Sequence, residues 1–171
     1  MQSNDKNLSK IKTAHYDAQC TSNSIRIEWN NGLIDQYDES SLNVPNDRIY
    51  EYSPEEILYH YNNDIHYANI TGDKKIILKN IQGDIYYYKK YGKLVVVEDH
   101  SDPPDNVFIF SIKKLLKCSA DLNKKDDRKK YHIISFSEWE SNIHHDSKYL
   151  YVSTENGLTK INIQTNKITE I

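Results

Sequence analysis

Alternation of apolar and polar residues around tight turns is the feature that most constrains the fold of this chain. In the stretch KYLYVSTENGLTKINIQTNKITEI, residues 148–171, apolar side chains recur at nearly every second position on both sides of Asn156-Gly157. A period of two is typical of strands with one buried face, and Asn-Gly is a preferred pair for a tight hairpin turn. We therefore expect a three-stranded antiparallel meander at 148–171.

The same pattern recurs upstream. SIRIEWNNGLIDQYD, residues 24–38, predicts a hairpin around Asn31-Gly32, and residues 74–99 predict three strands with turns near Gly83 and Gly92. Aligning Gly83 with Gly157 superimposes 74–97 on 148–171 without gaps, which indicates either an internal duplication or the general similarity of strand–turn–strand segments. Further strands are expected at 107–112 and 131–136.

Helices are expected at three places. YSPEEILYHYNND, residues 52–64, begins with Ser53, Pro54 and Glu56, the residues of a capping box with proline at the first helical position. The other two expected helices are at 111–122 and 137–145, and the charged segment 123–130 is expected to be a loop. The fold class predicted from these elements is α+β, mainly antiparallel β-sheet of hairpins and meanders with two or three short helices. A mainly-β sandwich or blade-like assembly is the alternative.

Length and composition predict one domain over 1–171, with 1–23 as a loosely packed N-terminal arm. The chain has 171 residues and only five glycines and four prolines, so no Gly- or Pro-rich linker divides it. Cys20 and Cys118 are far apart and form no zinc-binding pattern. The first 20 residues contain no apolar signal-peptide core, and no apolar run is long enough for a transmembrane helix. These observations favour a cytoplasmic location and no membrane partner.

The sequence contains no recognisable catalytic motif. It lacks the nucleophile elbow, the phosphate-binding loop, the dinucleotide-binding glycines and the zinc-protease motif. Cys118 with His132 is the only nucleophilic pair worth naming, and a buried inert thiol is the more common interpretation. We expect no catalytic residue, no metal and no cofactor. A small enzyme with a dispersed carboxylate or histidine site remains an alternative.

The charges are segregated along the chain. Residues 28–73 carry ten acidic side chains and one arginine, whereas 113–130 carry eight basic and three acidic ones. Carboxylates steer a basic partner during association, and tyrosines supply rigid contact area. The acidic segment therefore predicts a partner-binding surface for a basic protein, made of Asp35, Asp38, Glu39, Glu51, Tyr52, Glu55, Glu56, Tyr59 and Asp64. The alternative is two solvated faces of a polar protein.

In size, AT-rich residue usage, lack of catalytic motifs and an acidic, tyrosine-bearing segment, the chain resembles bacterial immunity proteins of contact-dependent or polymorphic toxin systems. The resemblance is one of composition over the whole chain and carries no residue motif. It implies an antitoxin that binds and occludes a basic toxin domain, such as a nuclease, without chemistry of its own. A third function class is a nucleic-acid binder that uses the basic segment 123–130 together with DIYYYKKYGK, residues 84–93.

Overall fold

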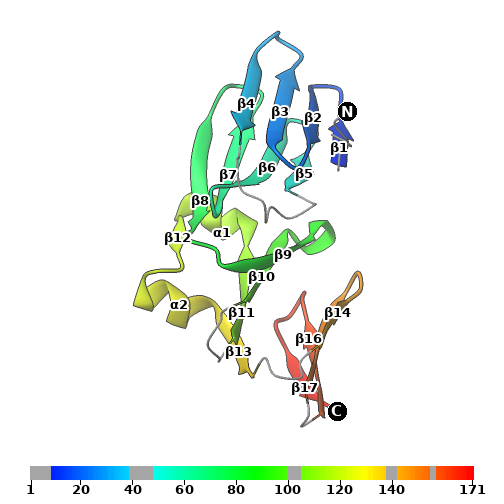
Figure 1. Ribbon diagram of the computed structural model, residues 1–171, viewed down its shortest axis with the longest axis vertical. Helices are drawn as coiled ribbons and strands as arrows, with labels where there is room; N and C mark the ends of the chain where they lie inside the picture. Colours follow the sequence, from blue (N-terminus) through cyan, green and yellow to red (C-terminus); the bar gives the residue numbers. More distant parts are fainter. Residues whose placement is uncertain (1–8, 39–47, 100–104, 138–141, 155–156) are drawn as a thin grey trace, which may run out of the picture. The chain divides into compact units, whose positions relative to one another are not determined.

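The computed structural model describes residues 9–38, 48–99, 105–137, 142–154 and 157–171 (Figure 1). The chain divides into two compact units, Met1–Lys79 and Asn80–Ile171. One domain for the whole chain stays a prediction.

The first unit begins with an antiparallel sheet in which four strands pair in chain order: β1 (Ser9–Lys12), β2 (Tyr16–Cys20), β3 (Ser24–Trp29) and β4 (Ile34–Asp38). The predicted hairpin at 24–38 is confirmed as β3 and β4. The loosely packed arm predicted for 1–23 is wrong over the described part, because Tyr16, Ala18 and Cys20 of β2 are buried. These three side chains alternate with polar Asp17 and Gln19, so the sequence of β2 does carry a weak period-two pattern.

The second set of strands in this unit also pairs in chain order: β5 (Ile49–Ser53), β6 (Glu56–Tyr61), β7 (Asp64–Asn69) and β8 (Lys74–Lys79). The helix predicted at 52–64 is wrong, because this segment forms the end of β5, a turn at Pro54-Glu55, all of β6 and the start of β7. The predicted first strand of 74–99 is confirmed as β8.

An apolar core holds the two sets of strands of the first unit together. It contains side chains from β2 and β3 on one side and from β5, β6 and β7 on the other, among them Ile25, Ile27, Ile57 and Ala68. All four are at most 1% exposed. Because side chains of a strand alternate between faces, the residues between them on β2 and β3 point to the opposite, outer face of the sheet. That outer face is where the exposed charges of this sheet lie.

The second unit contains a sheet of β9 (Gly83–Tyr88), β10 (Lys93–Glu98), β11 (Asp105–Ser111) and β13 (His132–Phe136), again in chain order. Between these strands lie the short helices η1 (Lys89–Tyr91), α1 (Ile112–Lys117) and α2 (Lys125–Tyr131) and the two-residue strand β12 (Ala120–Asp121). The predicted strands at 83–99, 107–112 and 131–136 are confirmed. The helix predicted at 111–122 is confirmed only as α1, and the loop predicted at 123–130 is wrong because most of it forms α2.

The last sheet consists of β14 (Asn142–His145), β15 (Tyr149–Thr154), β16 (Gly157–Asn162) and β17 (Ile168–Glu170). The meander predicted at 148–171 is confirmed. The helix predicted at 137–145 is wrong at 142–145, which is β14, and residues 138–141 lie outside the described part. The core of this unit joins Val95, Val97, Val107 and Ile109 to residues of β15 and β16.

The predicted predominance of antiparallel β-sheet is confirmed, and with few helical residues the mainly-β alternative with blade-like sheets fits the fold. Each sheet contains an up-and-down meander of four strands in chain order, the arrangement found in propeller blades. β8 pairs with β7 whereas β9 pairs with β10, so residues 74–97 span two sheets. The gap-free alignment of 74–97 with 148–171 therefore does not match one sheet to another.

Candidate functional site

The structure separates the predicted partner-binding residues into two groups at opposite ends of the first unit. Glu56 is paired with Asn69 at one end of the β6–β7 ladder, and Asp64 is paired with Tyr61 at the other. Glu55 lies beside Glu56, and Asp38 lies near Tyr61, whose hydroxyl donates to the Asp38 carbonyl over 3.2 Å. Glu39 lies outside the described residues.

Four turns of the first unit lie together at the Glu55 end. The Asn30 amide donates to the His15 carbonyl over 2.9 Å, and the Ile70 amide donates to the Glu55 carbonyl over 3.0 Å. The Thr13 hydroxyl donates to the Pro54 carbonyl over 2.8 Å. We call this region the hairpin-tip surface and define it as residues 12–17, 28–35, 53–56 and 69–75.

Acidic side chains outnumber basic ones on the hairpin-tip surface. It holds six carboxylates, those of Asp17, Glu28, Asp35, Glu55, Glu56 and Asp73, and three lysines, Lys12, Lys74 and Lys75. The side chain of Glu55 is 61% exposed and lies 3.7 Å from the His15 ring nitrogen. The sequence prediction included only Asp35, Glu55 and Glu56 from this group.

Two of the six carboxylates hold the fold together. Glu56 accepts hydrogen bonds from the Ser53 hydroxyl over 2.8 Å and from the Tyr67 hydroxyl over 2.6 Å. Burial, together with this hydrogen bond to Glu56, raises the pKa of Tyr67 to about 12. Asp35 is paired with Lys74 and with the indole of Trp29, and the hydrogen bond to Asp35 raises the pKa of Lys74. Glu56 and Asp35 are therefore not available to a partner.

At the other end of the unit, the predicted Tyr59 is a core residue. Its side chain is 2% exposed, stacks on Tyr37 and on His66 with ring centroids 5.0 Å apart in both cases, and donates to the Tyr37 hydroxyl over 2.9 Å. Burial raises the pKa of Tyr59 and lowers that of His66. The assignment of Tyr59 to a contact surface is wrong for this reason. Glu51 and Tyr52 are half-buried on β5.

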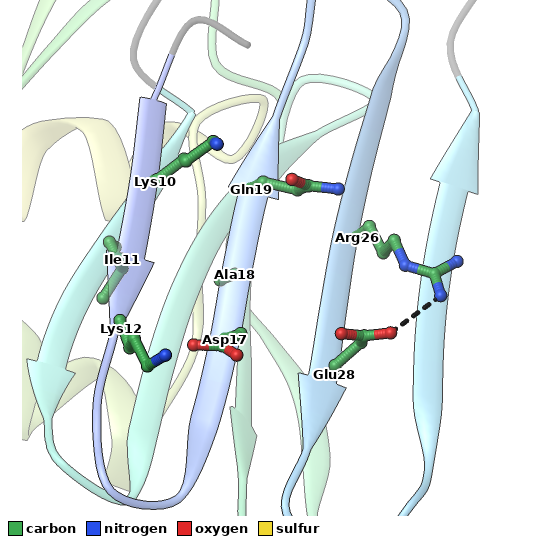
Figure 2. Close-up of a pocket in the computed structure, with 8 residues that line it drawn as sticks. All are labelled: Lys10, Ile11, Lys12, Asp17, Ala18, Gln19, Arg26 and Glu28. Atoms are coloured by element: carbon green, nitrogen blue, oxygen red, sulfur yellow. Dashed lines mark hydrogen bonds and ion pairs between the residues drawn. The ribbon is translucent and has the colours of Figure 1, made fainter.

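A shallow depression crosses the outer face of the β1–β4 sheet (Figure 2). Figure 2 shows Lys10 and Lys12 on β1 and Arg26 and Glu28 on β3, flanking Asp17 and Gln19 on β2. Arg26 is paired with Glu28 over 2.9 Å. A second depression continues from the first, shares Lys12, Asp17 and Glu28 with it, and reaches the hairpin tip at Thr13, Ala14, Tyr16, Trp29, Asn30, Gly32 and Ile34.

The second unit contains a polar network that the sequence does not predict. Buried Glu98 is held by Arg128 over 2.7 and 2.9 Å and by the Asn106 amide over 2.8 Å. Asn106 Oδ1 in turn faces the Ser135 hydroxyl over 2.7 Å and His132 Nε2 over 3.1 Å. A register shift between Val107 and Phe108 turns His132 and Ser135 to one side of the sheet, 2.8 Å apart.

This network is not arranged as a hydrolase relay. Asn106 and Ser135 both face the same ring nitrogen of His132, whereas a Ser-His-Asp relay uses one ring nitrogen for the serine and the other for the carboxylate. Among the described residues, no group of three or more His, Cys, Asp and Glu side chains is placed to hold a metal ion. The Cys118 side chain is exposed rather than buried as expected.

The basic segment 123–130 is partly committed to the fold. Arg128 of α2 is the partner of Glu98, and the Lys130 ammonium lies over the Tyr131 ring, 5.2 Å from its centroid. Lys124, Lys125 and Lys129 are exposed. Neither α1 nor α2, nor any other helix in the described part of the chain, combines the length and the apolar character needed to cross a membrane.

Comparisons with known proteins find likeness in structure alone. No protein-family model matches the chain, and no curated protein matches it. The extracellular domain of a putative one-component system from B. thetaiotaomicron superimposes with a TM-score of 0.54 and 14% identity over 100% of this chain and 26% of its own. Pyrococcus horikoshii acylaminoacyl peptidase gives 0.50 and 14% over 95% of this chain and 31% of its own. The β-propeller domain of the trilobed protease from Pyrococcus furiosus gives 0.47 and 14% over 95% and 56%.

At 14% identity these likenesses show the fold and nothing of the function. The chain spans about a quarter to a third of the first two structures.

Proposed function

We propose that this chain is a non-enzymatic protein-binding module and that a basic protein docks on the hairpin-tip surface of its first unit. The observation that carries the proposal is the excess of carboxylates over lysines at that surface, with Glu55 and Asp17 exposed. Turns displayed at one end of a rigid sheet are where binding residues commonly lie. Carboxylates at the rim of such a surface accelerate the encounter with a basic partner.

The kind of partner is inferred from the compositional resemblance to immunity proteins. In this proposal the partner is a toxin domain with a basic face, such as one that contacts phosphates. Docking the hairpin-tip surface on that face blocks access of the toxin to its substrate, so inhibition requires no catalytic group from this chain.

The test uses the product of the reading frame directly upstream of the gene, purified and titrated calorimetrically with this protein. Asp17→Lys combined with Glu55→Lys should weaken binding by about tenfold or more, and the loss should shrink at high salt. The matched control is Asp38→Lys combined with Asp99→Lys, which makes the same change in net charge at exposed sites outside the hairpin-tip surface.

An equal loss in both double variants would show a general charge effect and contradict the placement of the surface. An upstream product that does not bind the wild-type protein would contradict the proposed toxin partner.

A further inference from the structure

We propose that Leu33 and Ile34 are the apolar anchors of the hairpin-tip surface. We further propose that they take a basic segment of the partner in which a Lys or Arg stands beside a large apolar side chain. This inference rests on the proposed function and names the chemistry that the partner must present. It adds aliphatic anchors to a surface that the sequence predicts from carboxylates and tyrosines alone.

Leu33 and Ile34 are displayed to solvent at the tip of the β3–β4 hairpin. Leu33 is 60% exposed and Ile34 is 51% exposed, and in the described part of the first unit no other large apolar side chain has comparable exposure. Scattered exposed apolar residues are ordinary, but these two are consecutive at one hairpin tip, with Ile34 opposite Glu28 and Leu33 opposite Trp29. Removing exposed apolar area from water is favourable, so a partner that covers these side chains gains binding free energy.

Backbone hydrogen bonds fix the conformation of the turn that carries these two residues. Gly32 has φ +90, a conformation that glycine adopts freely. The Gly32 amide donates to the Trp29 carbonyl over 3.0 Å, and the Trp29 amide donates to the Leu33 carbonyl over 2.9 Å. The Leu33 amide also donates to Asn31 Oδ1 over 3.0 Å. The anchors are therefore held in place before binding, which lowers the entropy cost of docking.

Carboxylates stand beside Ile34 on the same face of the sheet. Asp17 is paired with Glu28 across β2 and β3, and Glu28 is paired with Ile34 across β3 and β4. Directly opposite residues of antiparallel strands have Cβ atoms about 5 Å apart and share one face. Figure 2 shows the Asp17 and Glu28 side chains on neighbouring strands. Across strands β2, β3 and β4, Asp17, Glu28 and Ile34 thus form a row of two acidic side chains followed by one apolar side chain.

The two carboxylates differ in how far they are already neutralised. Glu28 shares its charge with Arg26, whereas Asp17 makes no side-chain hydrogen bond or ion pair within the described ranges. Lys12 follows Asp17 in the same row on β1. A cationic side chain of the partner would find its best position between Asp17 and Glu28, and its apolar neighbour would then cover Ile34 and Leu33. An acidic segment or a nucleic acid would be repelled by the same carboxylates.

The probe is a library of random 12-residue peptides displayed on phage and selected on the immobilised full-length protein. Enriched peptides should carry Lys or Arg within two positions of Leu, Ile or Phe. A synthetic peptide of the enriched sequence is then titrated by fluorescence anisotropy. Leu33→Ser combined with Ile34→Ser should weaken its binding at least tenfold, whereas Ile168→Ser, at an exposed apolar site of the second unit, should leave it unchanged.

A second measurement does not depend on the folding of a variant. In methyl-labelled wild-type protein, addition of the same peptide should shift the Leu33 and Ile34 methyl resonances and leave those of the buried Ile25 and Ile27 unchanged.

Enriched peptides without apolar residues, or full binding by the Leu33→Ser, Ile34→Ser variant, would overturn the anchors. If the Leu33→Ser, Ile34→Ser variant bound the peptide fully, and Asp17→Lys with Glu55→Lys still weakened peptide binding, the proposed function would stand without Leu33 and Ile34 as anchors. Enrichment of acidic peptides would overturn both. Light-scattering masses that show a dimer lost on Leu33→Ser would identify a second copy as the occupant and overturn the partner segment.

Discussion

The indole Nε1 of Trp29 donates a hydrogen bond to Asp35 Oδ2 over 2.9 Å, and the other carboxylate oxygen of Asp35 is paired with Lys74. The Asp35 side chain is only 16% exposed. An acid that the sequence assigned to partner binding therefore joins the β3–β4 hairpin to the start of β8 within the first unit.

We predict that Asp35→Ala destabilises the protein without affecting partner binding at a temperature where the variant is folded. The change leaves the Trp29 N–H and the Lys74 ammonium without their acceptor, and an unsatisfied group of this kind costs about 1–3 kcal/mol. Urea denaturation measures the loss. Asp38→Ala, at an exposed acid three positions further along in the segment, is the control and should change stability by less than about 0.5 kcal/mol. Equal stability of the two variants would contradict the structural role of Asp35.

A second prediction concerns the Glu98–Arg128 pair of the second unit. Glu98 is 2% exposed and Arg128 is about one-third exposed at the side chain, so the carboxylate is the more strongly desolvated partner. Breaking a buried pair costs about 3–5 kcal/mol. Because Asn106 still donates to the Glu98 carboxylate in the variant, we expect Arg128→Met to cost about 2–3 kcal/mol, chiefly by leaving the Glu98 charge buried without a counterion.

The matched control is Arg26→Met, which breaks the exposed Arg26–Glu28 pair of the first unit. Exposed pairs contribute about 0–1 kcal/mol, so this variant should unfold at nearly the wild-type urea concentration. Comparable losses at Arg26 and Arg128 would contradict the difference in burial on which the prediction depends.

The error at 52–64 shows which local signals are ambiguous. Ser53, Pro54 and Glu56 suggest a helix start, but Pro54 also suits the second position of a β-turn. In the structure the Ser53 hydroxyl donates to the Glu56 carboxylate within that turn, so the same two residues pair through their side chains in a different backbone conformation. β6 has four consecutive buried residues, Ile57 to His60, so its two faces cannot be told apart by alternation. Strands buried on both sides lose the period-two pattern that reveals exposed ones.

The sequence predicted the negative charge of the hairpin-tip surface but not its exposed apolar residues. Glu55 followed from the acidic composition of 28–73, but Asp38 and Asp64 share that composition and lie at the other end of the unit. Pairing between strands decides this, and composition carries no information on it. Leu33 and Ile34 had a usable signal, since apolar residues directly after an Asn-Gly turn stand at a hairpin tip where the core is out of reach. Strand β2 had the right alternation, but Ala18 and its neighbour Asp17 are residue types depleted in strands.

A third prediction is a loss of stability on acidification that originates at His60. Burial, followed by the charges of Arg48 and His66, lowers the pKa of His60 to about 4 from an ordinary value of 6.5. The unfolded chain therefore binds a proton that the folded chain refuses between about pH 6.5 and 4, so stability falls as pH decreases through this window. Between pH 7 and pH 5 the contribution of His60 is a loss of about 2 kcal/mol.

His60→Gln should flatten this part of the pH dependence, measured as the urea midpoint at pH 7, 6 and 5. His66 has a pKa lowered in the same direction by burial, so a smaller slope should remain in the variant. His132→Gln, at an exposed histidine of the second unit, is the control and should keep the wild-type slope. A His60→Gln variant that loses as much stability as the wild type on acidification would contradict the assignment.

The last prediction compares two glycines that begin strands. Gly83 has φ +150 and Gly157 has φ +130, so alanine is strained at either position by about 1–3 kcal/mol. The surroundings differ. A Cβ at Gly83 would collide with the Val97 carbonyl oxygen and come within 2.8 Å of Glu98 Cα, both backbone atoms of the paired strand β10. A Cβ at Gly157 would meet only the Ile171 carbonyl oxygen, at an ordinary 3.5 Å.

Gly83→Ala should therefore destabilise the protein clearly more than Gly157→Ala, because β9 and β10 must move apart to admit the methyl group and lose ladder hydrogen bonds at the Gly83–Glu98 pair. Thermal unfolding monitored by circular dichroism measures both variants. A separation of more than about 5 °C in Tm is expected, since a difference of 1 kcal/mol shifts Tm by about 2–8 °C in domains of this size range. Equal Tm values would mean that backbone strain alone selects glycine at the two positions, and that the close approach of β10 to Gly83 is relieved at little cost.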